Sequence, residues 1–487
     1  MNNNFKVDKG CTIREAMECI NNSGRRVAFL IDQQNKFFGL ITDGDIRRAL
    51  LTGNKFDDSA IKIANLNPLT VKNDVSKEDC LKLMSDKKIY ELPVVDEKGE
   101  LKNVIFLSDL QNISLSKPDI TKRELDAIAE VLSSSVLSIG PKVKEFEKKI
   151  AEYIGVKHAI AVNSGTSALH LCVRSLDIRD GDEIITTPFS FIASANCALF
   201  ERAKPVFVDI NPDTLCIDPL KIEEKITSKT KAILPVHVFG HSCDMDAILE
   251  IAKKYKLAVI EDACEALGTK YNGKRVGSFG DCGVFAFYPN KQITTSEGGV
   301  IVTDNDKIAE LCRSMRNQGR TEGEGWLSHK RLGFNYRLGE LSAALGAVQM
   351  DRIEEILGKR EEVAQMYNNN LKNIDGIIVP YIALDIKMSW FVYVIRLNNK
   401  LFSQTTRDKI IEKLSERGMG CKNYFPPIHL EPFYKEMFGY KEGDFPITEA
   451  ISKSTIALPF YNNLKEKEVA YICDNLGQIM EKIKDND

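Results

Sequence analysis

The sequence predicts a two-part protein: a larger α/β domain with a mostly parallel sheet, preceded by a smaller, duplicated α+β module. From Ala159 onward, short runs of β-branched and aromatic residues alternate with helical patterns, which is typical of a parallel sheet covered by helices on both faces. Residues 1–112 instead repeat one helix–strand–turn–strand–helix unit. A chain of 487 residues is also long enough for more than one core.

The overall composition argues against several classes of protein. Hydrophobic residues make up 43% and charged residues 28% of the chain, and the net charge of -3 gives no basic surface for nucleic acid. No apolar stretch reaches the ~18 residues that span a bilayer, and the start MNNNFKVDKG lacks the apolar core of a signal peptide. The 12 cysteines show neither a CxxC pair nor a metal-ligand spacing. We therefore expect a cytoplasmic protein with reduced thiols and without nucleic-acid, membrane or metal partners.

An internal repeat occupies residues 1–112. The run TIREAMECI at Thr12–Ile20 aligns without gaps with SKEDCLKLM at Ser76–Met84, and GLITDGD at Gly39–Asp45 aligns with NVIFLSD at Asn103–Asp109. Each copy begins with a hydroxyl residue followed three positions later by an acid, which is a signature of a helix N-terminus. We therefore predict two packed copies of one module, at residues 1–64 and 65–112.

The duplicated module resembles a tandem pair of CBS modules, and GLITDGDIRRALL is the segment that carries the resemblance. Such pairs commonly bind an adenine nucleotide, whose phosphate and ribose are held by the threonine and aspartate of this segment. The resemblance implies these roles for Thr42 and Asp45 in the first copy and for Asp109 in the second. In the second copy, Phe106 replaces the threonine and Asn103 replaces the glycine, so a structural or dimerising module without a ligand is the alternative.

The larger domain begins after a short linker. The predicted linker is residues 113–118, whose stretch Ser114–Pro118 is mostly polar and ends in a proline. Thr121 and Glu124 then form a capping-box pattern that starts a helix. The segment Ala159–Leu176 predicts a strand, a turn rich in Ser, Gly and Thr, and an amphipathic helix. Further strands are expected in DEIITT, KPVFVDI, KAILPVHVFG, KLAVIED and GVFAFY.

Three motifs follow strand ends, which is where α/β domains bind ligands. In NSGTSALH, Gly165 allows close approach, and free N–H groups with the hydroxyls of Thr166 and Ser167 suit a phosphate, although a plain capped helix is the alternative. In VIEDACEALG, two carboxylates, Glu261 and Asp262, end an apolar strand, where a carboxylate either meets a cation or caps a helix. In FAFYPNKQITTSEGG, Lys291 follows a buried strand, and a solvated surface cation is the alternative. Pyridoxal phosphate uses all three groups, because it needs a phosphate cradle, an acid at its ring nitrogen and a lysine.

Residues 117–487 resemble the DegT/DnrJ/EryC1/StrS family of pyridoxal-phosphate-dependent sugar aminotransferases. The resemblance covers the whole larger domain and implies the fold type I architecture of aspartate aminotransferase. It implies a cofactor-binding large domain at 119–370, a small C-terminal subdomain at 371–487, and an obligate homodimer. The motifs that carry it, in chain order, are SIGPKVKEFE, NSGTSALH, PFSFIASANC, PVHVFG, EDACEALG, FYPNKQITTSEGG, RNQGR, GFNYRLGELSAALG, NYFPPIH and ALPFY.

The resemblance also implies roles for individual residues. Lys291 is the lysine that holds the cofactor as a Schiff base, and Asp262 is the partner of its ring nitrogen. Glu265 occupies the position of the family residue that faces the ring hydroxyl, and Phe191 that of the aromatic residue that stacks on the ring. Asn335 occupies the position of the residue that reaches the cofactor phosphate of the neighbouring subunit. The remaining residues are the cofactor-phosphate group Gly165, Thr166 and Ser167 and the substrate-side group Tyr336, Arg337, Tyr424 and His429.

Three positions near the lysine depart from the family pattern. Ala286 and Tyr288 stand where many relatives have serine and histidine, and Ser296 stands where a glycine is frequent. Because the serine of those relatives touches the phosphate, the cofactor phosphate is expected to be bound differently on this side.

The implied function is the transfer of an amino group, from glutamate, to the keto sugar of a nucleotide-sugar, for surface polysaccharides or glycans. One alternative is a non-nucleotide ketone such as a cyclitol. A second is a pyridoxal-phosphate-dependent sugar dehydratase, but members of that branch replace the lysine with histidine, so Lys291 argues against it. A third is a nucleotide-sensing regulator with an inactive larger domain, against which Lys291 and Asp262 argue together. Nucleotide binding to the CBS pair is expected to regulate the enzyme, or the pair only assembles subunits.

Overall fold

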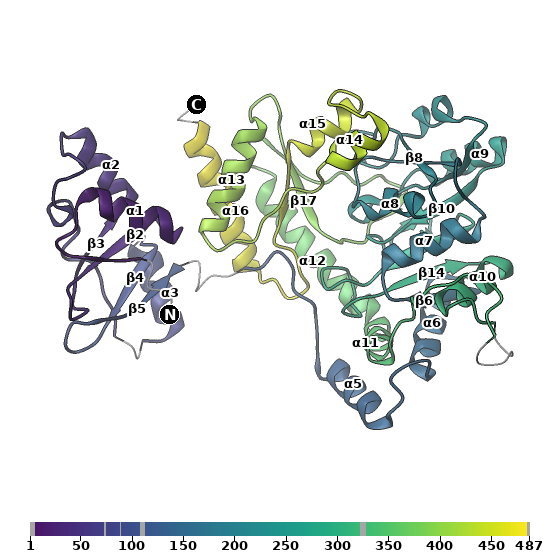
Figure 1. Ribbon diagram of the computed structural model, residues 1–487, viewed down its shortest axis with the longest axis horizontal. Coiled ribbons are helices and arrows are strands. Elements are labelled where there is room, and N and C mark those ends of the chain that lie inside the picture. Colours follow the sequence, from purple (N-terminus) through teal and green to yellow (C-terminus); the bar gives the residue numbers. More distant parts are fainter. Residues whose placement is uncertain (1–4, 73–74, 88, 108–112, 322–327, 485–487) are drawn as a thin grey trace. The chain divides into compact units, whose positions relative to one another are not determined.

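The chain folds into two compact units in this computed structural model (Figure 1). Unit 1 contains residues 1–112 and 415–419, and unit 2 contains residues 113–414 and 420–487. No described helix is both long and apolar enough to cross a membrane. The domain boundaries proposed from the sequence stay a prediction. The structure describes residues 5–72, 75–87, 89–107, 113–321 and 328–484.

Unit 1 consists of two similar copies of a helix followed by an antiparallel strand pair. Strand β2 pairs with β3, and β4 pairs with β5, in the same antiparallel manner. Phe29 from the first copy and Phe106 from the second belong to one shared core. The last helix expected in the second copy lies outside the described residues. The elements are β1 (Lys6–Asp8), α1 (Ile13–Ser23), β2 (Val27–Ile31), β3 (Phe37–Thr42), α2 (Asp43–Leu51), α3 (Lys77–Lys87), β4 (Glu91–Val95) and β5 (Leu101–Phe106).

The expected helix starts are confirmed. Thr12 caps α1 and forms a full capping box with Glu15. In the second copy, the Ser76 hydroxyl lies 2.7 Å from the Asp79 carboxylate and accepts the Asp79 N–H, which is the weaker version expected there. Thr121 caps α5 (Lys122–Ser134) with a complete box of its own.

Unit 2 is built on a seven-stranded sheet in the order β6-β14-β13-β10-β9-β7-β8 (Figure 1). Only β14 runs against the others, so the predicted, mostly parallel sheet is confirmed. The strands are nearly all apolar and buried, as expected for a sheet with both faces covered. They are β6 (His158–Val162), β7 (Glu183–Thr186), β8 (Lys204–Phe207), β9 (Thr230–Ile233), β10 (Ala258–Asp262), β13 (Cys282–Ala286) and β14 (Gly299–Thr303).

The helices of unit 2 cover this sheet with apolar faces. Helix α6 buries Val143, Phe146, Ile150 and Ile154, whose spacing places them on one face. Helix α7 packs against β10, β13 and β14, and α6 packs against the edge strand β6. The helices are α6 (Pro141–Ile154), α7 (Gly165–Ser175), α8 (Ala193–Phe200), α9 (Met245–Tyr255), α10 (Asp306–Arg316), α11 (Glu340–Asp351) and α12 (Ile353–Leu371).

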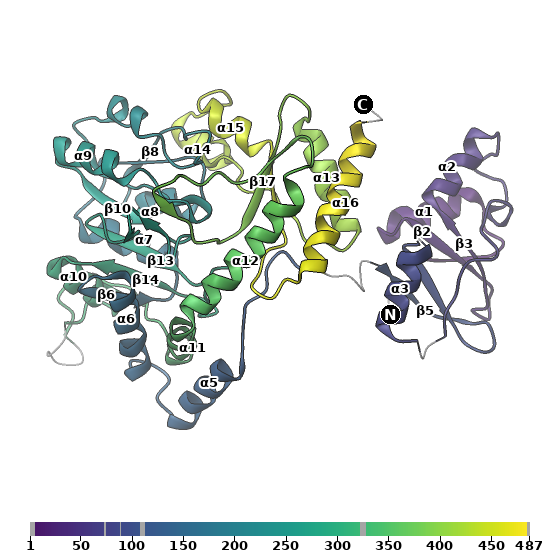
Figure 2. The ribbon, with the colours of Figure 1, turned by 180° about the vertical axis from the view of Figure 1, so that it is seen from behind.

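Unit 2 also contains two small three-stranded sheets, one of which joins two strands between β10 and β13 to a C-terminal strand, and further C-terminal helices. Helix α12 packs against α16 (Figure 2). One small sheet has the order β12-β11-β16 and the other β15-β17-β18. The elements are β11 (Lys270–Tyr271), β12 (Lys274–Arg275), β15 (Ile377–Ile378), β16 (Ile386–Lys387), β17 (Tyr393–Leu397), α13 (Gln404–Glu416), α14 (Pro432–Phe438), α15 (Pro446–Ser452), β18 (Thr455–Leu458) and α16 (Glu466–Lys484).

Candidate active site

The Asp262 carboxylate is buried at the carboxyl end of β10 and is held at both oxygens. The Ser194 hydroxyl donates a hydrogen bond to Asp262 Oδ2 at 2.6 Å, and the Cys264 N–H donates to Oδ1 at 3.1 Å. Asp262 is only 4% exposed. Two donors on different oxygens fix the rotation of the carboxylate, so its remaining lone pairs have a set direction.

A second serine orders the hydroxyl that holds Asp262. Ser190 Oγ lies 2.7 Å from Ser194 Oγ, and both side chains are buried. Because the Ser194 proton points at the Asp262 carboxylate, Ser194 can only accept from Ser190. The chain Ser190 to Ser194 to Asp262 therefore has one direction. Phe191, between the serines, is 60% exposed, which suits a ring that stacks on a ligand.

Lys291 is not a solvated surface cation. Its side chain is 13% exposed, and Nζ lies 3.6 Å from Glu265 Oε1 and 3.9 Å from the centroid of the Phe391 ring. Glu265 also accepts the N–H of Phe239 at 2.9 Å. Burial raises the pKa of Glu265 above its ordinary value, and the nearby Lys291 cation opposes this shift. The lysine amine is therefore largely shielded from solvent, and the Glu265 carboxylate lies beside it.

The start of α7 meets the strands that carry these two groups. Ser164 caps α7 by accepting the N–H of Ser167 at 3.1 Å. A Cβ added at Gly165 would lie 2.8 Å from the Ala286 Cβ and 3.2 Å from the Cys264 Sγ. Since Cys264 follows Asp262 and Ala286 precedes Lys291, this close approach brings the three predicted motifs to one edge of the sheet.

These groups fit pyridoxal phosphate. The N-terminus of α7 offers free N–H groups for a phosphate, and only glycine fits at position 165 without displacing β13. Asp262 is an oriented, buried carboxylate, and Lys291 is a partly desolvated amine. Ala286 leaves no hydroxyl on β13, so the hydroxyls of Thr166 and Ser167 remain as the predicted phosphate ligands. The individual cofactor contacts stay predictions.

The segment that carries the three predicted residues of the GFNYR motif lies beside the turn before α7, because the Tyr336 carbonyl accepts the Asn163 N–H at 2.9 Å and Arg337 pairs with Val162. Asn335 is exposed and pairs through its backbone with Asn317. The Tyr336 hydroxyl lies 3.2 Å from His170 Nδ1, and Arg337 donates to the Asn317 side chain at 3.0 Å. These contacts hold the segment firmly with Asn335 facing outward. Their roles toward a neighbouring subunit or a substrate stay predictions.

The two substrate-side residues near the C-terminus lie in different surroundings. Burial raises the pKa of the Tyr424 hydroxyl, and so does the charge of Glu265, whereas a hydrogen bond with Asn290 lowers it. Because Glu265 acts on it, Tyr424 lies close to the Lys291 group. His429 is fully buried, and its Nε2 lies 3.1 Å from the Glu449 carboxylate. Burial lowers the pKa of His429. Both substrate roles stay predictions.

Sequence reasoning missed the residues that support Asp262. Ser190 and Ser194 are four positions apart in PFSFIAS, so a helical turn aligns them, and this spacing was the available signal. Glu261 is the third residue whose role was missed, because from the sequence it is as good a candidate acid as its neighbour Asp262. Its carboxylate instead accepts three N–H groups, from Gly277, Phe279 and Gly280, at 2.6–2.8 Å. It is a structural acceptor that holds the strand end.

In unit 1, the predicted nucleotide residues have a local structural role. Thr42 caps α2, and the Asp45 carboxylate accepts the Thr42 N–H at 2.9 Å and its hydroxyl at 2.7 Å. Burial would raise the pKa of Asp45, but these bonds and Arg48 hold it below its ordinary value. Nucleotide binding there stays a prediction, and Asp109 lies outside the described residues.

Comparisons with known proteins find a matching family and relatives over most of the chain. Residues 118–477 match the DegT/DnrJ/EryC1/StrS aminotransferase family, and residues 1–52 and 60–115 match the CBS domain. The chain is 40% identical over 376 residues to a GDP-perosamine synthase of Caulobacter vibrioides, covering 77% of this chain and 100% of that protein. It is 35% identical to a UDP-4-amino-4,6-dideoxy-N-acetyl-beta-L-altrosamine transaminase of Campylobacter jejuni, covering 76% and 98%. Among solved structures, Helicobacter pylori PseC, an aminotransferase involved in the biosynthesis of pseudoaminic acid, matches with a TM-score of 0.72 and 33% identity, over 76% of this chain and 99% of that one.

Proposed function

The chain belongs to the DegT/DnrJ/EryC1/StrS aminotransferase family, and we propose that it transfers an amino group from glutamate to the keto group of a nucleotide-linked sugar. The observation that carries the proposal is the convergence of Lys291, Asp262 and Gly165 at one edge of the sheet. The names of the relatives, a GDP-perosamine synthase and a UDP-amino-sugar transaminase, support a nucleotide-sugar substrate.

Each residue has a defined task in this reaction. Bound pyridoxal phosphate supplies an electron sink that accepts and passes on the amino group. Lys291 would hold the cofactor through its amine, and the same amine would move the proton that the reaction transfers. The Asp262 carboxylate would hold the ring nitrogen, the α7 N-terminus would bind the phosphate, and Phe191 would cover one face of the ring.

The proposed reaction has two halves that are measurable separately. With pyridoxal phosphate bound, glutamate alone is expected to bleach the visible absorbance of the protein and to release 2-oxoglutarate. A nucleotide-linked 4-keto sugar is then expected to restore the absorbance and to carry away the amine. Restoration by a keto cyclitol but by no nucleotide-sugar would contradict the proposed substrate, and a protein that glutamate does not bleach would contradict the proposed donor.

We propose that the enzyme works as a homodimer, with Asn335 serving the active site of the second copy. Helix α5 supports this, because Leu125 and Leu132 on it are 60% and 56% exposed, and exposed apolar surface of this kind marks an interface. Sedimentation of the full chain is expected to give a species of twice the monomer mass. A monomer that turns over glutamate at full rate would contradict the proposal. The cytoplasmic location likewise stays a prediction.

We further propose that an adenine nucleotide binds to the CBS pair at Thr42 and Asp45 and changes the rate of transamination. The two residues are half-buried at the start of α2, where N–H groups suit a phosphate. AMP or ATP is expected to change the rate of the wild-type enzyme, and Asp45→Ala is expected to remove this response and leave the basal rate unchanged. No binding by calorimetry together with no change in rate would leave the pair with an assembly role only.

A further inference from the structure

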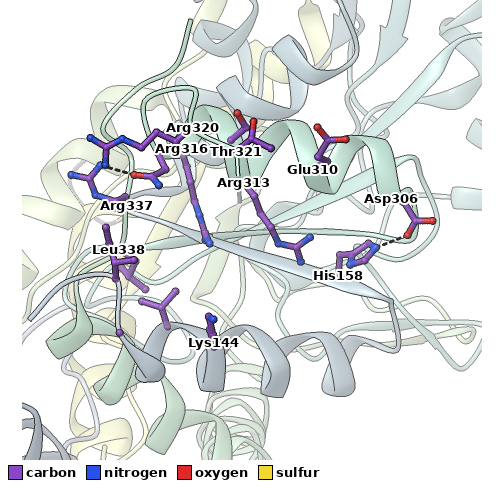
Figure 3. Close-up of a pocket in the computed structure, with 15 residues that line it drawn as sticks. Lys144, His158, Asp306, Glu310, Arg313, Arg316, Arg320, Thr321, Arg337 and Leu338 are labelled. Carbon is purple, nitrogen blue, oxygen red and sulfur yellow. Dashed lines mark hydrogen bonds and ion pairs between the residues drawn. The ribbon is translucent and has the colours of Figure 1, made fainter. Parts of the chain in front are cut away.

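A cavity of about 610 Å³ lies between α6 and α10, along the edge strand β6 (Figure 3). It shares no residue with the group around Lys291. Its lining comes from four separate parts of unit 2: α6 with the two residues before it, β6, α10 with the segment that follows it, and the segment around Arg337. The cavity therefore lies between several elements of the fold and not beneath one loop.

Positive charge dominates this cavity. Its lining holds five cationic side chains and two carboxylates. The carboxylates are already engaged, since Asp306 lies 2.7 Å from His158 Nε2 and Glu310 pairs with Arg331. The five cationic side chains are those of Lys144, Arg313, Arg316, Arg320 and Arg337.

Two of the cations lack partners in the part of the chain that the structure describes. Arg316 pairs with Glu147, which itself accepts an N–H of the edge strand. In contrast, neither Lys144 nor Arg313 forms an ion pair or hydrogen bond with a described residue. Lys144 points up from α6 and Arg313 points down from α10 into the same space (Figure 3). Facing cations repel one another unless an anion lies between them.

A buried hydroxyl adds an independent observation. Ser314 on α10 is 4% exposed and lines the cavity. Its Oγ is buried and has no hydrogen-bond partner among the described residues. A buried polar atom without a partner costs free energy, and a bound ligand, ion or water at this hydroxyl would offset that cost. Ser314 follows Arg313 in the chain, and a hydroxyl can donate a hydrogen bond to a phosphate oxygen.

The remaining wall of the cavity is apolar, so it favours a ligand with an organic part over a free inorganic ion. Ile139, Val143 and Leu338 contribute apolar surface to the same cavity. We propose that the cavity binds a phosphate-bearing organic metabolite, with its phosphate between Lys144 and Arg313, near Ser314, and its organic part on the apolar wall. The site includes Arg337 of the predicted substrate-side group but none of the residues described around Lys291, and its test does not need the proposed sugar substrate.

Calorimetry on the full chain, saturated with pyridoxal phosphate so that the cofactor phosphate site is filled, tests the proposal. The two probes are inorganic phosphate and glucose 1-phosphate. Glucose 1-phosphate is expected to bind about tenfold more tightly than inorganic phosphate, because only it covers apolar wall. The double variant Lys144→Gln with Arg313→Gln is expected to weaken its binding at least about tenfold. The Ser314→Ala variant is expected to weaken it several-fold.

Matched variants separate this site from general surface charge. Lys148→Gln, on the same helix, and Arg179→Gln, an exposed arginine of unit 2, are expected to bind glucose 1-phosphate as the wild type does. Equal affinity of wild type and double variant would overturn the proposal. The absence of any binding would also overturn it. An acidic side chain of a second copy would then be the candidate occupant of the space between Lys144 and Arg313. Equal affinity for the two probes would contradict the proposal that the organic part of the ligand lies on the apolar wall.

Discussion

Lys291→Ala is expected to abolish transamination, with a fall in turnover of at least about a thousandfold. In the proposed reaction, the lysine amine holds the cofactor and then moves the proton, and its removal leaves both tasks without a group. The side chain is 13% exposed, and its Nζ lies 3.6 Å from Glu265 Oε1. The measurement is the rate of 2-oxoglutarate release from glutamate, with pyridoxal phosphate in excess.

Two further variants separate chemistry from folding. Lys291→Arg keeps a cation beside Glu265 but cannot act as the amine, and it is expected to be as inactive as the alanine variant. Lys204→Ala removes an exposed lysine at the far strand of the same sheet and is expected to leave turnover unchanged. Turnover of Lys291→Ala within about tenfold of wild type would mean that another group carries the proton.

The sequence predicted those features that depend on local pattern. Alternating strands and helices predicted the sheet of unit 2, and the spacing of hydroxyl and acid predicted the helix starts at Thr12 and Thr121, as the structure confirms. Lys291 and Asp262 could be singled out because each follows a buried strand, and parallel strands end at one edge. The family was evident from motifs in order along the chain, and the comparisons confirm it.

What the sequence could not predict depends on contacts between distant segments. Glu261 and Asp262 are adjacent acids at one strand end, and nothing local tells which faces the ligand. The fold decides, because Glu261 turns toward the N–H groups of residues 277–280, whereas Asp262 turns toward Ser194. The cavity beside β6 is a further case, since its cations come from helices far apart in sequence.

Asp262→Asn is expected to lower turnover at least about a hundredfold, because it removes the buried charge that, in the proposed reaction, holds the proton on the cofactor ring nitrogen. The shape of the side chain is retained, so packing at the end of β10 should persist. The dissociation constant of pyridoxal phosphate is expected to rise as well, and fluorescence titration measures it independently of turnover. An Asp262→Asn enzyme with wild-type turnover and cofactor affinity would show that the carboxylate has no role at the ring.

The two serines behind Asp262 predict a graded series of losses in turnover and cofactor affinity. An acid with only a structural role would not give such a series. Ser194→Ala removes the 2.6 Å hydrogen bond but leaves the charge, so its loss of turnover and of cofactor affinity should be smaller than that of Asp262→Asn. Ser194→Thr keeps the hydroxyl and should restore most of both. Ser190→Ala removes only the donor behind Ser194 and should have the smallest effect. If all variants unfolded at lower denaturant in proportion to their loss of activity, the order would reflect stability. If the order held at unchanged unfolding midpoints, Asp262 would act through its orientation and charge at the ring.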